Sequence, residues 1–175
     1  MPKKGWKHRA KQVRLLLLDA DGVLTDGRLG YDGEGREVKF FHIRDGLGIR
    51  LLQQAGITVG ILTGRRSESV AIRARELGID LFFEAVRNKG QVLESILGEG
   101  KFRREQVCFV GDDVLDLSVL SRVGLAVAVA DGVPEVKEVS HYITQRPGGQ
   151  GAVREVCELI LKAQKKWDQI LRKYH

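Results

Sequence analysis

Short apolar runs alternate with segments of helical period along most of the chain. The runs are nearly continuous in Val, Ile and Leu, which is typical of strands in a parallel sheet covered by helices on both faces. The expected strands span residues 13–18, 57–62, 81–84, 107–110 and 125–129. Apolar stripes at three- and four-residue spacing predict helices between them. The stripes are Leu47, Leu51, Leu52 and Ala55; Val70, Ala74 and Leu77; and Val92, Leu93, Ile96 and Leu97. This alternation predicts an α/β fold with a doubly wound, Rossmann-like parallel sheet.

Two segments depart from the alternation. The sequence at about residues 27–43 predicts a short β-hairpin insert, with strands at 28–31 and 37–43 around the turn sequence DGEG. A last helix is expected at about 152–173, with inward-facing residues Val153, Val156, Ile160, Trp167 and Leu171. The size of the chain predicts that residues 1–175 form a single domain.

The composition, 43% hydrophobic and 30% charged, is typical of a globular protein. No apolar run approaches the roughly 20 residues of a membrane span, and the basic N-terminus lacks the apolar segment of a secretory signal. We therefore expect a cytoplasmic protein with no membrane partner. Cys108 and Cys157 lie in apolar patterns, which predicts core residues rather than a disulfide or metal ligands.

The net charge of +6 comes largely from the two ends of the chain. No aromatic-interleaved basic motif of a nucleic-acid-binding module accompanies these charges. The pattern predicts solvated basic termini, including Lys3 and Lys4, and no nucleic-acid partner. A basic protein can also attract small anionic molecules.

Polar residues gather where four of the expected strands end. The first strand ends at DADG, the second at LTGRR and the fourth at FVGDDVLD, and a lysine opens the helix after the third. Because ligands bind beyond the carboxyl ends of parallel strands, one rim of the sheet is expected to hold the whole set. The set is Asp19, Asp21, Thr63, Lys89, Asp112, Asp113 and Asp116. Each residue alone has a plain alternative as a turn or helix cap, but the ordered set indicates a site.

These residue types suit phosphoryl transfer. Asp19 and Asp112 offer the hard oxygen ligands that Mg²⁺ prefers, and Asp19 can also attack phosphorus as a nucleophile. Asp21 can protonate a leaving oxygen and later activate water. Thr63 and Lys89 can bind the phosphoryl oxygens as charge redistributes in the transition state.

The four motifs DADGVLTDG, LTGR, Lys89 and GDDVLD resemble, in order, those of the haloacid dehalogenase superfamily of phosphohydrolases. The resemblance covers essentially the whole chain. The segments FHIRDGLGIR, VGLAVAVADG and GGQGAVREVCELIL are similar to the capless subfamily that acts on 2-keto-3-deoxy sugar-acid phosphates. This resemblance implies a Mg²⁺-dependent phosphoric monoester hydrolase that works through an aspartyl-phosphate. The implied substrate is 3-deoxy-D-manno-octulosonate 8-phosphate, in lipopolysaccharide precursor synthesis; another nonulosonate 9-phosphate, from an acylneuraminate or ketodeoxynononate, is the alternative.

The resemblance also implies a role for each matching position. Asp19 would be nucleophile and metal ligand, Asp21 the acid/base and a ligand through its carbonyl, and Asp112 the remaining ligand. Asp113 and Asp116 would support metal-bound water or Lys89. The implied substrate contacts are Asp21, His42, Ile43, Arg44, Asp45, Gly46, Arg50, Gly64, Arg65, Arg73 and Lys89. Judged from residues alone, Arg50 and Arg73 are equally well explained as exposed helix charges, and His42 as a packed strand residue.

The hairpin stands where most relatives have a cap domain. The resemblance therefore implies a homotetramer in which a neighbouring subunit completes the site, with the hairpin segment KFF between subunits. Asp26 is expected to begin the hairpin, as a turn residue or as a hydrogen-bonding brace, rather than to bind metal. The glycine-rich segment RPGGQGAV, residues 146–153, either binds an anion at the following helix or only connects to it.

A phospho-receiver signalling domain is the alternative from another class. Its phosphoacceptor aspartate follows the third strand, where this chain has FFEAV. Its acidic pair is adjacent, whereas Asp19 and Asp21 are separated by one residue. The order of the motifs therefore favours the phosphatase.

Overall fold

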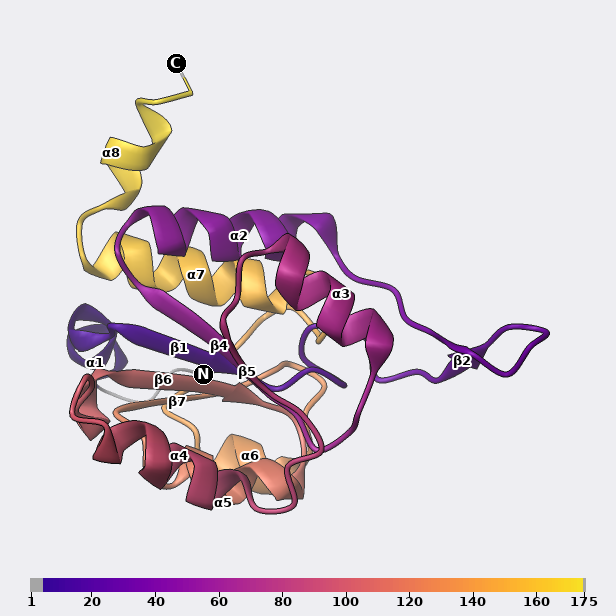
Figure 1. Ribbon diagram of the computed structural model, residues 1–175. Helices are drawn as coiled ribbons and strands as arrows, with labels where there is room; N and C mark the ends of the chain where they lie inside the picture. Colours follow the sequence, from indigo (N-terminus) through magenta and orange to yellow (C-terminus); the bar gives the residue numbers. More distant parts are fainter. Residues whose placement is uncertain (1–4, 175) are drawn as a thin grey trace.

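The computed structural model describes residues 5–174, so the predicted basic residues Lys3 and Lys4 lie outside the described part. Parallel strands form a six-stranded sheet in the order β5-β4-β1-β6-β7-β8, and helices cover both faces (Figure 1). The strands are β1 (Leu15–Leu18), β4 (Thr58–Leu62), β5 (Leu81–Phe83), β6 (Val107–Gly111), β7 (Leu125–Ala128) and β8 (Tyr142–Ile143). The predicted doubly wound α/β architecture is confirmed.

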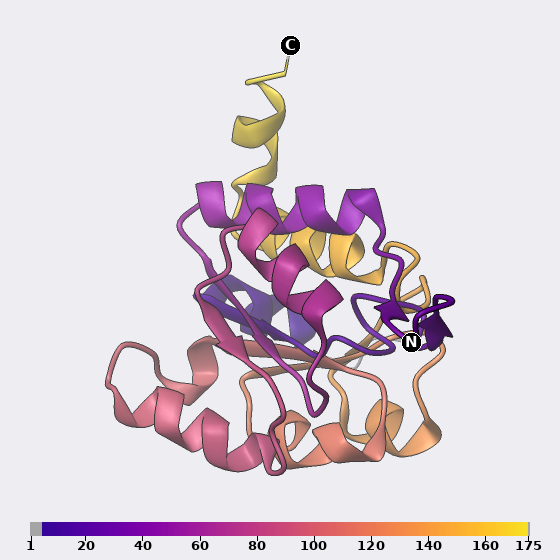
Figure 2. The same cartoon turned by 45° about the vertical axis from the view of Figure 1, so that its right-hand side comes forward.

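The helices divide between the two faces, as Figure 2 also shows. One face carries α1 (Trp6–Gln12), α2 (Ile43–Gln54), α3 (Glu68–Glu76), α7 (Ala152–Ala163) and α8 (Trp167–Leu171). The other carries α4 (Lys89–Gly98), α5 (Leu117–Leu120) and α6 (Pro134–Val139). Leu16 and Leu18 pack into the first core and Leu15 and Leu17 into the second, because successive strand residues point to opposite faces. This division explains why every residue of β1 is apolar.

The strand order reverses at β1, which pairs with β4 on one side and β6 on the other. Leu18 therefore lies between Ile61 and Val110. Such a reversal opens a crevice beyond the carboxyl ends of the strands. The residues after β1 and β6 consequently reach the same crevice, as the sequence predicted.

The hairpin is shorter than predicted. Its strands β2 (Gly30–Tyr31) and β3 (Glu37–Val38) have two residues each, and α2 already begins at Ile43. The prediction of a strand over 37–43 is wrong beyond Val38, since pairing with β2 ends at Gly30–Val38 and the chain enters α2 at Ile43. Phe40 is 79% exposed, whereas Phe41 packs against the core. The hairpin projects from the body at the right of Figure 1.

The single predicted helix over 152–173 is instead two helices, α7 and α8. Lys165 adopts a φ of 58°; its N–H bonds to the Lys162 carbonyl, and the Lys166 N–H bonds to the Leu161 carbonyl. These two bonds form a Schellman motif, which ends a helix through a left-handed residue. The chain then turns away from α7 (Figure 1). The predicted burial of Leu171 is wrong for that reason, since its side chain is 38% exposed.

Of the other sequence predictions, the structure confirms some and contradicts others. Leu47 was expected in the core but is 46% exposed and lines an open hollow beside α7. Cys108 and Cys157 are buried free thiols in the core, as predicted. The sequence analysis missed α1, α5, α6 and β8, which are short; Pro134 at the start of α6 was a usable signal. None of the helices in residues 5–174 combines the length and apolarity needed to cross a bilayer.

The left-handed conformation of Lys165 leads to a stability prediction. A β-carbon in this region costs about 1–2 kcal/mol, part of which glycine offsets through its greater freedom in the unfolded chain. Lys165→Gly should therefore raise the free energy of unfolding by about 0.5–1 kcal/mol in urea titrations. Arg75→Gly, at an exposed position inside α3, is the matched control and should lower it by about 1 kcal/mol. A loss of stability in Lys165→Gly would contradict this account of the helix end.

Candidate active site

Three carboxylates and one ammonium group meet beyond β1 and β6. Asp19 follows β1, Asp112 follows β6, and Asp116 ends a 3₁₀ turn; one oxygen from each lies within 4.8 Å of the others. Lys89, the first residue of α4, places its Nζ 2.6 Å from Asp116 Oδ1 and 2.9 Å from Asp19 Oδ1. Asp19, Lys89 and Asp116 are buried, and Asp112 is partly exposed.

One ammonium group does not balance this cluster. Burial raises the pKa of Asp19 to about 6, with repulsion from Asp116 adding to the rise and attraction to Lys89 opposing it. Burial also raises the pKa of Asp112 to about 8, together with repulsion from its carboxylate neighbours. The pKa of Lys89 is raised because the attraction of Asp19 and Asp116 outweighs the effect of burial. A further cation at the cluster would relieve the remaining repulsion.

The free oxygen atoms show which residues fit a metal ion. Asp112 Oδ1 is buried and has no hydrogen-bond partner. Both oxygens of Asp116 are already engaged, Oδ1 with Lys89 and Oδ2 with the Asp112 N–H at 2.9 Å. The cluster therefore offers Asp112 and Asp19 as hard oxygen ligands, which suit Mg²⁺.

Close backbone approaches hold the first motif in place. Gly22 has a φ of 86°, and a β-carbon there would lie 2.1 Å from Asp112 Oδ2. A β-carbon on Gly148 would lie 1.7 Å from the Gly22 carbonyl oxygen, and the Gly149 N–H bonds to the Val23 carbonyl at 2.9 Å. The glycine-rich segment therefore packs against the loop after β1, and anion binding at the start of α7 stays a prediction. The predicted turn at Asp26 is confirmed, because its Oδ1 accepts the Arg28 N–H.

A cavity of about 550 Å³ opens over the cluster. It includes all seven residues that the sequence placed on the rim of the sheet, together with Gly64 and Arg65. The further lining residues in the described chain are Gly27, Val86, Arg87 and Leu115. Thr63 is buried, and its hydroxyl accepts the Arg65 N–H at 3.4 Å.

The other predicted substrate contacts lie outside this cavity. They are His42, Ile43, Arg44, Asp45, Gly46, Arg50 and Arg73, none of which is among the described residues that line it. Ile43, Arg44 and Arg50 are exposed on α2. A β-carbon on Gly78 would lie 3.6 Å from Arg50 Nη1, which places Arg50 beside the end of α3. His42 precedes α2, and its Nδ1 is buried without a hydrogen-bond partner.

Asp45 and Arg73 are engaged within the fold. The buried carboxylate of Asp45 accepts the N–H groups of Gly151 and Arg154, so it caps the start of α7 from α2. The Arg73 guanidinium lies over the Phe41 ring at 5.9 Å. A β-carbon on Gly46 would lie 2.3 Å from Arg73 Nη2, so a side chain there would displace the Arg73 guanidinium.

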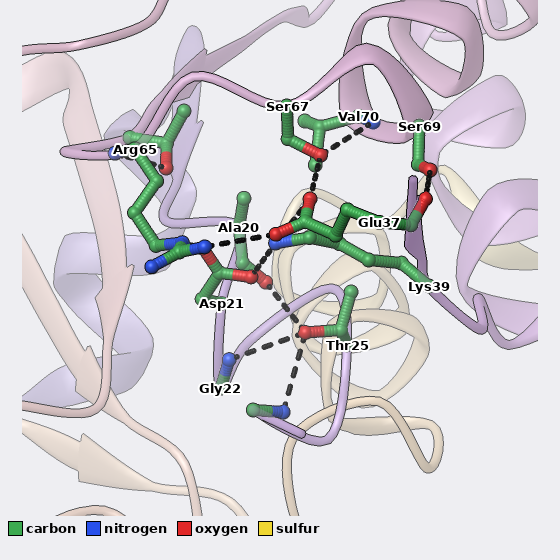
Figure 3. A network of polar contacts seen from close by, with 12 residues as sticks. Ala20, Asp21, Gly22, Thr25, Glu37, Lys39, Arg65, Ser67, Ser69 and Val70 are labelled. Atoms are coloured by element: carbon green, nitrogen blue, oxygen red, sulfur yellow. Dashed lines mark hydrogen bonds and ion pairs between the residues drawn. The ribbon is translucent and has the colours of Figure 1, made fainter. Parts of the chain in front are cut away.

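Two hairpin residues that the sequence analysis did not assign also reach the site (Figure 3). The Lys39 side chain is fully buried, forms an ion pair with Asp21 Oδ1 and lies 3.5 Å from Glu37 Oε1. Glu37 in turn accepts hydrogen bonds from Arg65 Nη2 at 2.9 Å and Ser67 Oγ at 2.5 Å. The segment KFF was expected to lie between subunits as a hydrophobic face, but Lys39 points into the site and Phe41 packs against the core, which leaves Phe40 exposed. The spacing of Glu37 and Lys39 by two residues, which places both on one side of an extended segment, was the signal in the sequence.

Comparison with known proteins agrees with the family resemblance found in the sequence. The family model for haloacid dehalogenase-like hydrolases matches residues 79–155. The chain is 45% identical to 3-deoxy-D-manno-octulosonate 8-phosphate phosphatase of Yersinia pestis over 158 residues, which are 90% of this chain and 84% of the relative. It is 44% identical to the enzyme of the same name from Escherichia coli K12 over 92% of this chain and 86% of the relative.

Solved structures share the fold over nearly the full length. The crystal structure of 3-deoxy-D-manno-octulosonate 8-phosphate phosphatase from Moraxella catarrhalis, in complex with a magnesium ion, a phosphate ion and KDO, superposes with a TM-score of 0.94. It is 39% identical, and the match covers 97% of this chain and 98% of that one. The cobalt-bound enzyme from Haemophilus influenzae gives a TM-score of 0.86 at 39% identity, over 90% of this chain and 92% of that one. On this identity and coverage, the chain belongs to the 3-deoxy-D-manno-octulosonate 8-phosphate phosphatase family of the haloacid dehalogenase-like hydrolases.

Proposed function

We propose that this chain hydrolyses the phosphate monoester of a 2-keto-3-deoxy sugar acid, with 3-deoxy-D-manno-octulosonate 8-phosphate as its substrate. The observation that carries the proposal is the meeting of Asp19, Lys89 and Asp112 with Asp21 at one cavity. The names of the relatives support the substrate. The whole chain would act as one domain in the bacterial cytoplasm, supplying a free sugar acid for lipopolysaccharide precursors.

The chemistry divides into two steps on Asp19. Its carboxylate attacks phosphorus and forms an aspartyl-phosphate while the bond from phosphorus to the sugar oxygen breaks. Asp21 donates a proton to that leaving oxygen. Asp21 then takes a proton from water as the water attacks phosphorus, which releases inorganic phosphate and restores Asp19.

The remaining residues of the cavity neutralise charge. Lys89 keeps Asp19 ionised for attack, and with Thr63 and Gly64 it would bind the phosphoryl oxygens. Asp19, Asp112 and the Asp21 carbonyl would hold Mg²⁺, which supplies positive charge against the phosphoryl group. Asp113 and Asp116 would support this arrangement from outside, Asp116 through its ion pair with Lys89. Arg65 lies at the cavity where it can bind an anionic group of the substrate.

Assembly into a homotetramer is the second part of the proposal. The hairpin and the start of α2 carry an apolar surface, here called the hairpin surface, formed by Leu29, Tyr31, Phe40, Ile43 and Leu47, each at least 46% exposed. Exposed apolar area of this kind favours a protein interface. A neighbouring copy on this surface would complete the open cavity in place of a cap. Substrate contact by residues 42–46, Arg50 and Arg73 stays a prediction for that assembly.

Asp19→Asn should abolish phosphate release from 3-deoxy-D-manno-octulosonate 8-phosphate, because an amide cannot act as the nucleophile. A loss of at least about 10⁴-fold in kcat is expected from removal of a covalent catalyst. The fold should persist, because an isosteric side chain also reduces repulsion in the cluster. Circular dichroism serves as the folding control, and released phosphate is the measurement.

The same assay compares the octulosonate 8-phosphate with nonulosonate 9-phosphates on the wild-type protein. A higher kcat/KM for the 9-phosphates would identify a nonulosonate 9-phosphate as the substrate instead. Retained turnover in Asp19→Asn would refute the mechanism itself.

Mg²⁺ should raise the melting temperature, because it relieves repulsion among Asp19, Asp112 and Asp116. At a concentration of about 100 times Kd the gain is about 2.7 kcal/mol, or about 5–10 °C for a chain of this size. Asp112→Asn should melt at or above the temperature of the metal-free wild type, yet lose this shift. An unchanged shift in Asp112→Asn, measured by scanning calorimetry, would exclude Asp112 as a ligand.

Light scattering tests the assembly. The wild type should have a mass near four chains, and the double variant Phe40→Asp, Ile43→Asp should dissociate, because it places charge in the apolar contact. Val139→Asp is the matched control at an exposed apolar position on α6 and should leave the mass unchanged. A wild-type monomer at working concentration would sink the proposal.

A further inference from the structure

Lys39 carries a buried positive charge directly behind the carboxylate that we assign as acid and base (Figure 3). We propose that Lys39 is a positioning residue that anchors one oxygen of Asp21, so that the other oxygen faces the leaving group of the substrate. This inference rests on the proposed function. It adds to the motif residues a hairpin residue that the motifs do not contain.

The contacts of Lys39 leave it little freedom. Its side chain has no exposed area, and the ammonium group faces Asp21 and Glu37. An ammonium group removed from water is costly unless it is paired with carboxylates. Displacing Asp21 from Lys39 would therefore leave a buried charge with only the more distant Glu37 as counter-ion.

The two oxygens of Asp21 have different surroundings. Oδ1 is the atom paired with Lys39, whereas Oδ2 lies 3.6 Å from Arg65 Nε. The side chain is 22% exposed and lines the cavity. Anchoring Oδ1 would leave Oδ2 as the oxygen that exchanges a proton with the substrate oxygen.

Glu37 connects this arrangement to the loop after β4. Its carboxylate binds Arg65 and Ser67, and its carbonyl accepts the Ser69 hydroxyl at 3.2 Å. Burial alone would raise the pKa of Glu37, but hydrogen bonds from Ser67 and Arg65 and the nearby Lys39 charge hold it below its usual value. Glu37 is thereby kept as a charged partner that holds Lys39 in place.

Lys39→Met removes the charge and keeps the length of the side chain. Without the anchor, Asp21 should protonate the leaving oxygen less efficiently, and a poor leaving group depends most on that proton. The test compares phenyl phosphate, which has the poorer leaving group, with p-nitrophenyl phosphate. The parameter measured is kcat/KM, because it includes only the steps up to departure of the leaving group. The loss should be at least about tenfold greater for phenyl phosphate, since general acid catalysis contributes about 10²–10⁴-fold.

Three further variants make the comparison specific. Asp21→Asn, which removes the acid itself, should show the same dependence on leaving group to a larger extent. Lys101→Met removes a positive charge at an exposed position and should change neither rate. Glu37→Gln weakens the hold on Lys39 without removing its charge, so this variant should show the same dependence on leaving group to a smaller extent. It replaces Lys39→Met in the test if Lys39→Met does not fold.

Equal losses with both substrates in both hairpin variants would overturn the proposal, because Lys39 would then act through the fold alone. Unchanged rates would overturn it as well. If the wild type hydrolyses neither aryl phosphate nor the sugar-acid phosphate with Mg²⁺, the proposed function itself fails. An active wild type with losses independent of leaving group defeats only the role of Lys39.

Discussion

Repulsion among carboxylates at the ends of β1 and β6 is the constraint on which the rest of the site depends. Asp19, Asp112 and Asp116 lie within 4.8 Å of one another with Lys89 as their nearest counter-charge. The sheet imposes this proximity, because Leu18 and Val110 are paired neighbours and their chains end on the same side. The arrangement costs stability unless a cation joins it. A site that binds a metal and a phosphate needs this imbalance, since a fully neutralised cluster would hold a metal ion only weakly.

Distant parts of the chain keep the cluster in position through backbone contacts. Asp45 caps α7 at Gly151 and Arg154, and the glycines just before α7 pack on the backbone at Gly22. Gly22 in turn leaves the space that the Asp112 carboxylate occupies. Contacts therefore connect the segment around Asp45 to the reaction centre through α7 and the glycine loop.

The sequence predicted the sheet and the rim residues well, because both follow from local patterns. A strand of four leucines that ends in Asp19 is recognisable without tertiary information, and the carboxyl ends of parallel strands meet by geometry. The roles of Lys39 and Asp45 were missed because they depend on pairings across 18 and 106 to 109 residues. The break at Lys165 was missed because the sequence has no glycine there to announce a left-handed residue.

The hairpin presents different residues on its two sides. Glu37 and Lys39 point toward the site. Val38 and Phe40 lie on the other side, and they are 39% and 79% exposed. An isolated hairpin of two-residue strands is at best marginally stable in water, so contacts on its sides must fix its position. The inner ion pairs supply part of that restraint, and a partner covering the apolar outer side would supply more. Because Lys39 belongs to the same short segment, a partner that covered the outer side would also steady the contact between Lys39 and Asp21. In the proposed mechanism, assembly would then favour proton transfer by Asp21.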